Sequence, residues 1–207
     1  MKVELIIFRH GETDWNRERR AMGTTDIPLN AVGKQQAEIL AARLARERID
    51  ALYTSQLTSA KETMDAVARH HRLPVIILDD LREMNLGLFE GKLKADRALL
   101  FPEFDAGNDE HRLRMRMDTF SHWVSALRTQ TLPNLMQRHD GQTIALSTHD
   151  QKMRALLIAL GMPDETKRTV LKNCAMTKIS IKDGDITVLL HNDTSHLNTG
   201  NVLEKKL

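Results

Sequence analysis

The chain has 207 residues, of which 41% are apolar, and its 30 Lys and Arg residues against 28 Asp and Glu residues give a net charge of +2. This length is sufficient to bury a sizeable core in one α/β domain. The balanced charge argues against a nucleic-acid or membrane-surface protein, although the sequence pI is about 8.7.

Cysteine content and apolar runs indicate the cellular compartment. Cys174 is the only cysteine, so no internal disulfide can form and a reducing compartment is expected. The N-terminal apolar stretch is too short for a signal peptide, and no stretch reaches the ~20 apolar residues of a membrane helix. We therefore predict a cytoplasmic protein with no membrane and no nucleic-acid partner. No spacing of histidine and cysteine indicates a metal site, and no cofactor is expected.

The first half of the chain alternates predicted strands and helices. The apolar run from Val3 to Phe8 is typical of a strand buried on both faces. Asn30 can cap a helix that runs to about Arg48, with Val32 among its apolar stripe. The next expected elements are a strand over 50–54, a helix over 58–70 and a strand over 75–78.

The second half begins with a segment over 81–108 that has no clean period, which we interpret as an irregular lid that selects the substrate. Apolar residues then recur at helical spacing and predict one amphipathic helix: Leu113, Met117, Phe120, Val124 and Leu127. The remaining elements are a strand over 142–148, a helix with buried residues from Met153 to Leu160, a hairpin over 175–191 around Asp183-Gly184, and a loosely held tail from about 192.

This order predicts a single α/β domain over residues 1–207: a three-layer sandwich with a mainly parallel sheet, helices on both faces and an antiparallel C-terminal hairpin. Such sheets bind their ligands at the carboxyl ends of the strands. Polar residues fall at three of these ends. Arg9 and His10 follow the first strand, Glu83 lies beyond the third, and His149 follows the fourth.

These residue types suit phosphoryl transfer. A neutral imidazole is a nucleophile toward phosphorus, and the Arg9 guanidinium would bind a phosphate and lower the pKa of His10. Arg9, His149 and the Asn16 amide would stabilise the transferring group, while Glu83 would protonate the leaving oxygen and then accept a proton from water. We therefore predict a metal-independent phosphomonoesterase that acts on a small phosphorylated metabolite through a phosphohistidine.

The segment FRHGETDWN, followed by Gly23, Gly33 and Gln36, resembles the signature of the histidine phosphatase superfamily in its phosphoglycerate-mutase-like branch. LREMNLGLFEG and THDQKMRALL resemble the segments that carry the family's acid/base glutamate and its second histidine. By position, the resemblance implies these roles: His10 as the phosphorylated nucleophile, Glu83 as the proton donor, and Arg9, Asn16 and His149 as phosphate ligands.

The chain also departs from the family pattern. Ser59 stands where the family usually has a phosphate-binding arginine, and Asp150 would place a carboxylate near a bound phosphate unless it caps the following helix. Met22 replaces a common glutamine and, with Gly23 and Thr24, completes the candidate pocket. These departures indicate an unusual substrate or reduced activity.

Two rival functions stay open. One is a phosphoglycerate-type mutase, although Met84 follows the glutamate where mutases usually have arginine. The other is a weakly active or inactive relative that binds a phosphorylated ligand or a protein partner. The basic residues of the lid region are interpreted as a solvated face, and a homodimer stays open; these residues are Lys92, Lys94, Arg112, Arg114 and Arg116.

Overall fold

The computed structural model describes residues 1–102, 108–163 and 170–202. Its centre is a six-stranded sheet in the order β3-β2-β4-β1-β5-β6. The first four strands of this order are parallel, β5 runs antiparallel to β1, and β6 runs antiparallel to β5. The strands are β1 (Lys2–Arg9), β2 (Ala51–Thr54), β3 (Val75–Ile77), β4 (Thr143–Thr148), β5 (Met176–Lys182) and β6 (Asp185–Asp193). The predicted α/β fold class is confirmed.

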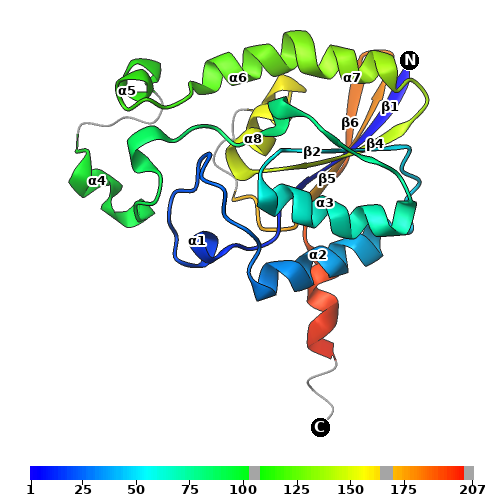
Figure 1. Cartoon of the computed structure of the whole chain (residues 1–207). Coiled ribbons are helices and arrows are strands. Elements are labelled where there is room, and N and C mark those ends of the chain that lie inside the picture. Colours follow the sequence, from blue (N-terminus) through cyan, green and yellow to red (C-terminus); the bar gives the residue numbers. More distant parts are fainter. Residues whose placement is uncertain (103–107, 164–169, 203–207) are drawn as a thin grey trace.

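The central strand β1 is buried on both faces, as its apolar run predicts. Leu5 and Ile7 pack with residues of the helices on one face, and Ile6 and Phe8 pack with those on the other. This alternation follows from the two-residue period of a strand. Figure 1 shows the resulting layers, with α2 and α3 on one side of the sheet and α6, α7 and α8 on the other.

Helices cover both faces. The helices that pack near the sheet are α2 (Ala31–Leu44), α3 (Thr58–His71), α6 (Phe120–Ala126), α7 (Leu132–Arg138) and α8 (Asp150–Ala159). The Asn30 side chain caps α2 by accepting from the Gly33 amide, as predicted, but the helix ends at Leu44 and Val32 is exposed. No helix in the described ranges is both long and apolar enough to cross a membrane.

The prediction of a single amphipathic helix from Leu113 to Leu127 is wrong. Helix α5 (Asp109–Arg114) ends before Arg116, whose φ of 56° is left-handed and cannot continue a right-handed helix. A second helix, α6, begins at Phe120 and passes through a π-helical segment (Leu127–Thr131) into α7. Leu113 is therefore 64% exposed instead of joining the apolar stripe.

The segment expected to be an irregular lid consists of short turns. It contains 3-10 turns at Asp79–Leu81, Gly87–Phe89 and Lys94–Asp96 and the short helix α4 (Arg97–Leu100), while residues 103–107 lie outside the described part. Phe89 anchors it by packing against Ala21 and Met117. In Figure 1, α4 and α5 lie away from the sheet, beyond the end at which α1 (Asp14–Arg17) sits.

The C-terminal hairpin forms around its predicted turn. Asp183 and Gly184 have φ values of 50° and 94°, as a two-residue turn with left-handed central residues requires. After β6 the chain continues in a 3-10 helix (Ser195–Val202), in which His196 is buried and Leu197 packs on the core beneath α2. The tail predicted to be loosely held from about residue 192 is thus packed as far as Leu197.

Candidate active site

The sheet topology brings His10 and His149 together. Strands β1 and β4 are adjacent and parallel, Arg9 pairs with Thr148 in register, and each histidine is the next residue. The His10 amide donates to the Thr148 carbonyl at 3.0 Å, and the two ring centroids lie 5.0 Å apart. On the other side of β4, Ser55 follows β2, and its hydroxyl lies 2.9 Å from Nε2 of His149.

The His10 ring is oriented and neutral. Its Nδ1 lies 2.7 Å from the Gly11 carbonyl, which can only accept, so Nδ1 carries the proton and Nε2 keeps its lone pair. The residue is 2% exposed. Burial, together with the neighbouring charge of Arg9, lowers the pKa of His10 to about 3. The ring is therefore an unprotonated nucleophile at neutral pH.

The loop after His10 is held by close backbone packing and by one asparagine. A Cβ at Gly11 would lie 2.5 Å from the Gly33 carbonyl oxygen, so the loop can pass the start of α2 only with glycine there. The Asn173 amide nitrogen donates to the carbonyls of His10 and Gly11, at 3.1 and 3.2 Å, and to Oδ1 of Asn16 at 2.9 Å. Asn173 comes from the segment before β5, where no sequence motif pointed to it.

Arg9 places a positive charge beside both rings. Its Nη1 donates to the Leu171 carbonyl at 2.6 Å, while its buried Nε has no hydrogen-bond partner among the described residues. Burial first, and then the neighbouring His10 and Arg9, lower the pKa of His149 well below its usual value. Both imidazoles are consequently neutral. A bound phosphate would need a nucleophile and hydrogen-bond donors, and a neutral imidazole can serve as either.

Glu83 lies in the wall of the same site, with its carboxylate at the N-terminus of α8. The carboxylate accepts from the backbone amides of Met84, Gln151 and Lys152, at 2.8, 3.1 and 3.2 Å. Burial raises the pKa of Glu83, and the Asp150 charge adds to this, while the amide bonds oppose it. A carboxyl with a raised pKa can act as a proton donor near neutral pH and as an acceptor afterwards.

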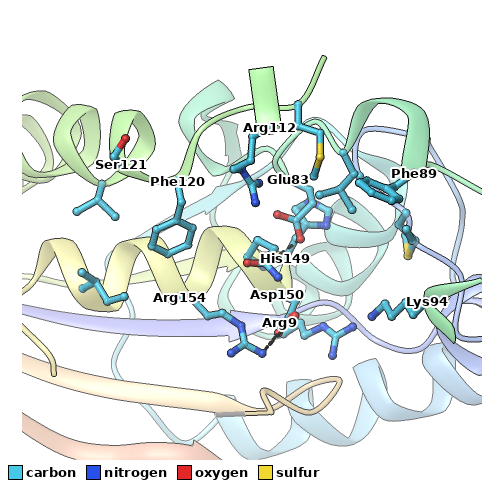
Figure 2. A pocket seen from close by; sticks show the side chains of 18 of the residues that line it. Arg9, Glu83, Phe89, Lys94, Arg112, Phe120, Ser121, His149, Asp150 and Arg154 are labelled. Atoms are coloured by element: carbon cyan, nitrogen blue, oxygen red, sulfur yellow. Dashed lines mark hydrogen bonds and ion pairs between the residues drawn. The ribbon is translucent and has the colours of Figure 1, made fainter. Parts of the chain in front are cut away.

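These residues line one cavity of about 1100 Å³, which includes Arg9, His10, Asn16, Glu83 and His149. Figure 2 shows His149, Glu83 and Arg9 around it. Within the described residues, the structure therefore brings together every side chain expected to touch the phosphate.

The candidate pocket residues divide into two groups. Met22, Gly23 and Asp150 line the cavity, whereas Thr24 and Ser59 are not among its described lining residues, contrary to the prediction. The Thr24 amide and hydroxyl instead donate to the Glu90 carboxylate, which holds that loop. Ser59 is buried in the first turn of α3.

Two arginines in the wall were not predicted. Arg112, interpreted as part of a solvated face, is only 7% exposed and donates from Nε to the Asp118 carbonyl at 2.7 Å. Arg154 forms an ion pair of 3.0 Å with Asp150, so Asp150 does not cap α8, whose N-cap position is His149. The four-residue spacing of Asp150 and Arg154 on one helix was the signal that could have identified this pair. Lys92 and Lys94, also assigned to the solvated face, line the cavity as well.

Across the described part of the chain, no three His, Cys, Asp or Glu side chains lie close enough to hold one metal ion together.

Comparisons with known proteins agree with this arrangement. The chain is 31% identical over 201 residues to "Phosphoglycerate mutase-like protein 4" of Arabidopsis thaliana, covering 94% of this chain and 87% of that protein. It is 31% identical over 199 residues to "Phosphoserine phosphatase 1" of Hydrogenobacter thermophilus, covering 94% of each. The solved structure of Bacillus stearothermophilus YhfR superposes with a TM-score of 0.81 at 28% identity, covering 94% of this chain and 99% of that one.

A family model matches almost the whole length of the chain. The matched residues are 5–194, which include both histidines, Arg9 and Glu83, and the relatives named above carry phosphatase and mutase names. The chain therefore belongs to the histidine phosphatase superfamily, branch 1.

Proposed function

We propose that this chain is a metal-independent phosphomonoesterase that hydrolyses a small phosphorylated metabolite through a phosphohistidine on His10. Family membership supports a phosphatase activity in general. The observation that carries the finer proposal is the neutral, buried His10 ring, with its Nε2 lone pair unengaged by the Gly11 contact and Arg9 beside it. A nucleophile and a phosphate-binding cation thus line the same cavity.

In the first step, Nε2 of His10 attacks phosphorus, and the bond between phosphorus and the ester oxygen breaks. Glu83 in its protonated form gives its proton to the leaving oxygen, so that the alcohol departs neutral. The raised pKa of Glu83 supports this role, because it keeps a larger share of the carboxyl protonated near neutral pH.

In the second step, water attacks the phosphohistidine. The Glu83 carboxylate takes a proton from this water, the bond between Nε2 and phosphorus breaks, and inorganic phosphate leaves with the oxygen of the water. His10 and protonated Glu83 are both regenerated. One phosphomonoester and one water thus give one alcohol and one phosphate.

The charge on the transferring phosphoryl oxygens requires donors. Arg9, His149 and the Asn16 amide are placed to supply them, since all three line the cavity. The Asn16 amide now donates to the Met22 sulfur at 3.3 Å. Because a thioether is a weak acceptor, a phosphate oxygen would replace it at little cost.

The test is hydrolysis of p-nitrophenyl phosphate by the parent chain, by His10→Ala and by His122→Ala, in the presence and absence of EDTA. His122 is an exposed histidine on α6 and serves as the matched control. We expect His10→Ala to abolish turnover, and His122→Ala and EDTA to leave it unchanged. Equal rates for the parent and His10→Ala would refute the nucleophile, and loss of activity with EDTA would refute metal independence.

The substrate and the mutase alternative are tested with a panel of phosphorylated metabolites. The names of the relatives make phosphoserine and 3-phosphoglycerate the first compounds to compare. Release of labelled phosphate supports hydrolysis, whereas retention of the label in an isomerised phosphoglycerate supports the mutase.

The third function, a weakened relative, is tested at Ser59. A large gain in turnover on Ser59→Arg would indicate a pocket weakened by the missing cation. Unchanged turnover by an active parent would show that the remaining cations suffice.

A further inference from the structure

Lys152 is a buried lysine whose backbone contacts Glu83. It lies in the first turn of α8, its side chain is fully buried, and its Nζ has no hydrogen-bond partner among the described residues. The Nζ instead sits over the ring of Trp123, which comes from α6. The backbone amide of Lys152 donates to the Glu83 carboxylate at 3.2 Å.

Stability does not explain a lysine here. Burying an ammonium without hydrogen bonds costs free energy, and an apolar side chain of similar length would fill the same space without that cost. The indole face repays part of the cost through a cation–π interaction. A charge held in this position therefore calls for a role beyond packing.

The charged groups around Lys152 indicate which carboxylate its ammonium can stabilise. Glu83, Asp80 and Asp118 favour its charged form, while burial and Arg82 oppose it, and burial is the largest effect, lowering the pKa of Lys152 to about 7. Asp80 already accepts from the Thr131 hydroxyl at 2.6 Å, and Asp118 accepts from the Asn85 amide at 2.8 Å. Glu83 is the acidic neighbour that lines the cavity.

Two nearby charges act on the pKa of Glu83 in opposite directions. Asp150, two residues before Lys152 on α8, raises the pKa of Glu83, whereas Lys152 lowers it. The carboxylate of Glu83 must persist between the two chemical steps, because it is the base of the second. Without a nearby cation, burial and Asp150 would both favour its protonation.

We propose that Lys152 is a positioning residue of the catalytic site: its ammonium, held on the Trp123 ring, stabilises the carboxylate of Glu83 while the phosphohistidine waits for water. The role rests on the proposed function, because it concerns the second step of that reaction. Lys152 is not among the described residues that line the cavity, so it would act through Glu83 and not on the substrate itself.

The kinetic test uses Lys152→Met, which keeps an apolar stem of similar length without the charge. Glu83 must be protonated in the first step, so we expect the alkaline limb of kcat/KM against pH to move up by about one pH unit. Near neutral pH, kcat should fall with little change in KM, and phosphoenzyme should accumulate. Lys152→Arg keeps the charge and should retain the parent profile, while Asp150→Asn should move the limb downward. An unchanged limb in Lys152→Met would overturn the proposal.

A second measurement does not depend on turnover. The Glu83 carboxyl is titrated by carbon NMR in the parent and in Lys152→Met, and the Lys152 ammonium by nitrogen NMR in the parent and in Glu83→Gln. Coupling is reciprocal, so the pKa of Glu83 should rise without Lys152 by as much as that of Lys152 falls without Glu83. Absence of both changes overturns the proposal even if the chain is an active phosphatase. Their presence in a chain that hydrolyses nothing would overturn the proposed function and the role in turnover, but not the coupling between Lys152 and Glu83.

Discussion

His10 stays neutral in the folded protein to far lower pH than in the unfolded chain, so protonation of this residue should contribute to destabilisation of the fold by acid. The perturbation that isolates it is His10→Asn. An Asn amide can donate to the Gly11 carbonyl as Nδ1 of His10 does, at 2.7 Å in the parent, but it does not titrate. Most of the contribution of His149 cancels, because burial, the largest cause of its lowered pKa, acts in both proteins.

The magnitude follows from the two pKa values of His10. It is about 3 in the folded protein and 6.5 in the unfolded chain. Since the folded value is the lower one, the unfolded state binds more protons, and stability is lost as pH falls from 6.5 toward 3. At about pH 4.5 the loss is about two pH units at 1.36 kcal/mol each, or roughly 3 kcal/mol, and at about pH 7.5 it is near zero.

The assay is urea unfolding of the parent and His10→Asn at these two pH values. We expect the free energy of unfolding of the parent to fall by about 3 kcal/mol more than that of the variant between them. Such a difference is a large share of the ~5–15 kcal/mol that stabilises a typical domain. Equal losses in the two proteins would mean that the folded protein accepts a proton on His10, and the reasoning on the nucleophile would be refuted.

Three further variants probe the rest of the site. Glu83→Gln should lower kcat/KM for an alkyl phosphate by ~10²–10⁴-fold but much less for p-nitrophenyl phosphate, whose leaving group needs no proton, and equal losses on both would contradict the acid role. Arg9→Met should lower kcat/KM by ~10–150-fold and move the acid limb to higher pH, because the Arg9 charge lowers the pKa of His10; a limb that stays in place would contradict this coupling. Asn173→Ala should lower the free energy of unfolding by about 1–3 kcal/mol, because three acceptors lose their donor, and an unchanged urea midpoint would show that the loop needs no such anchor.

The sequence predicted those parts of the site that follow from strand order. Arg9, His10 and His149 each lie at or just beyond the end of a parallel strand, and neighbouring strands in register bring such residues together. Glu83 was placed by its position after the third strand, and its contact with the amides of α8 could not be foreseen without the packing of that helix. Local pattern and topology thus sufficed to predict which of these residues gather at one edge of the sheet.

The remaining features depend on contacts between segments distant in the chain. The helix predicted through Leu113 is broken at Arg116, whose left-handed backbone leaves no trace in hydrophobic spacing. Arg112 lines the cavity instead of a solvated face. Thr24 is drawn away from the cavity by Glu90, a residue 66 positions further along. Sequence pattern records periodicity and turn chemistry, but not these pairings.

The most direct test of the account is to trap and locate the phosphorylated residue. Glu83→Gln is mixed with p-nitrophenyl phosphate, quenched in base within the first turnover, digested, and mapped by mass spectrometry, with His10→Ala as the control. We predict a base-stable, acid-labile phosphohistidine on the peptide that contains His10, and none in the control. A phosphate on another residue, or turnover by the parent with no phosphoenzyme at any time, would contradict the claim that His10 is the nucleophile.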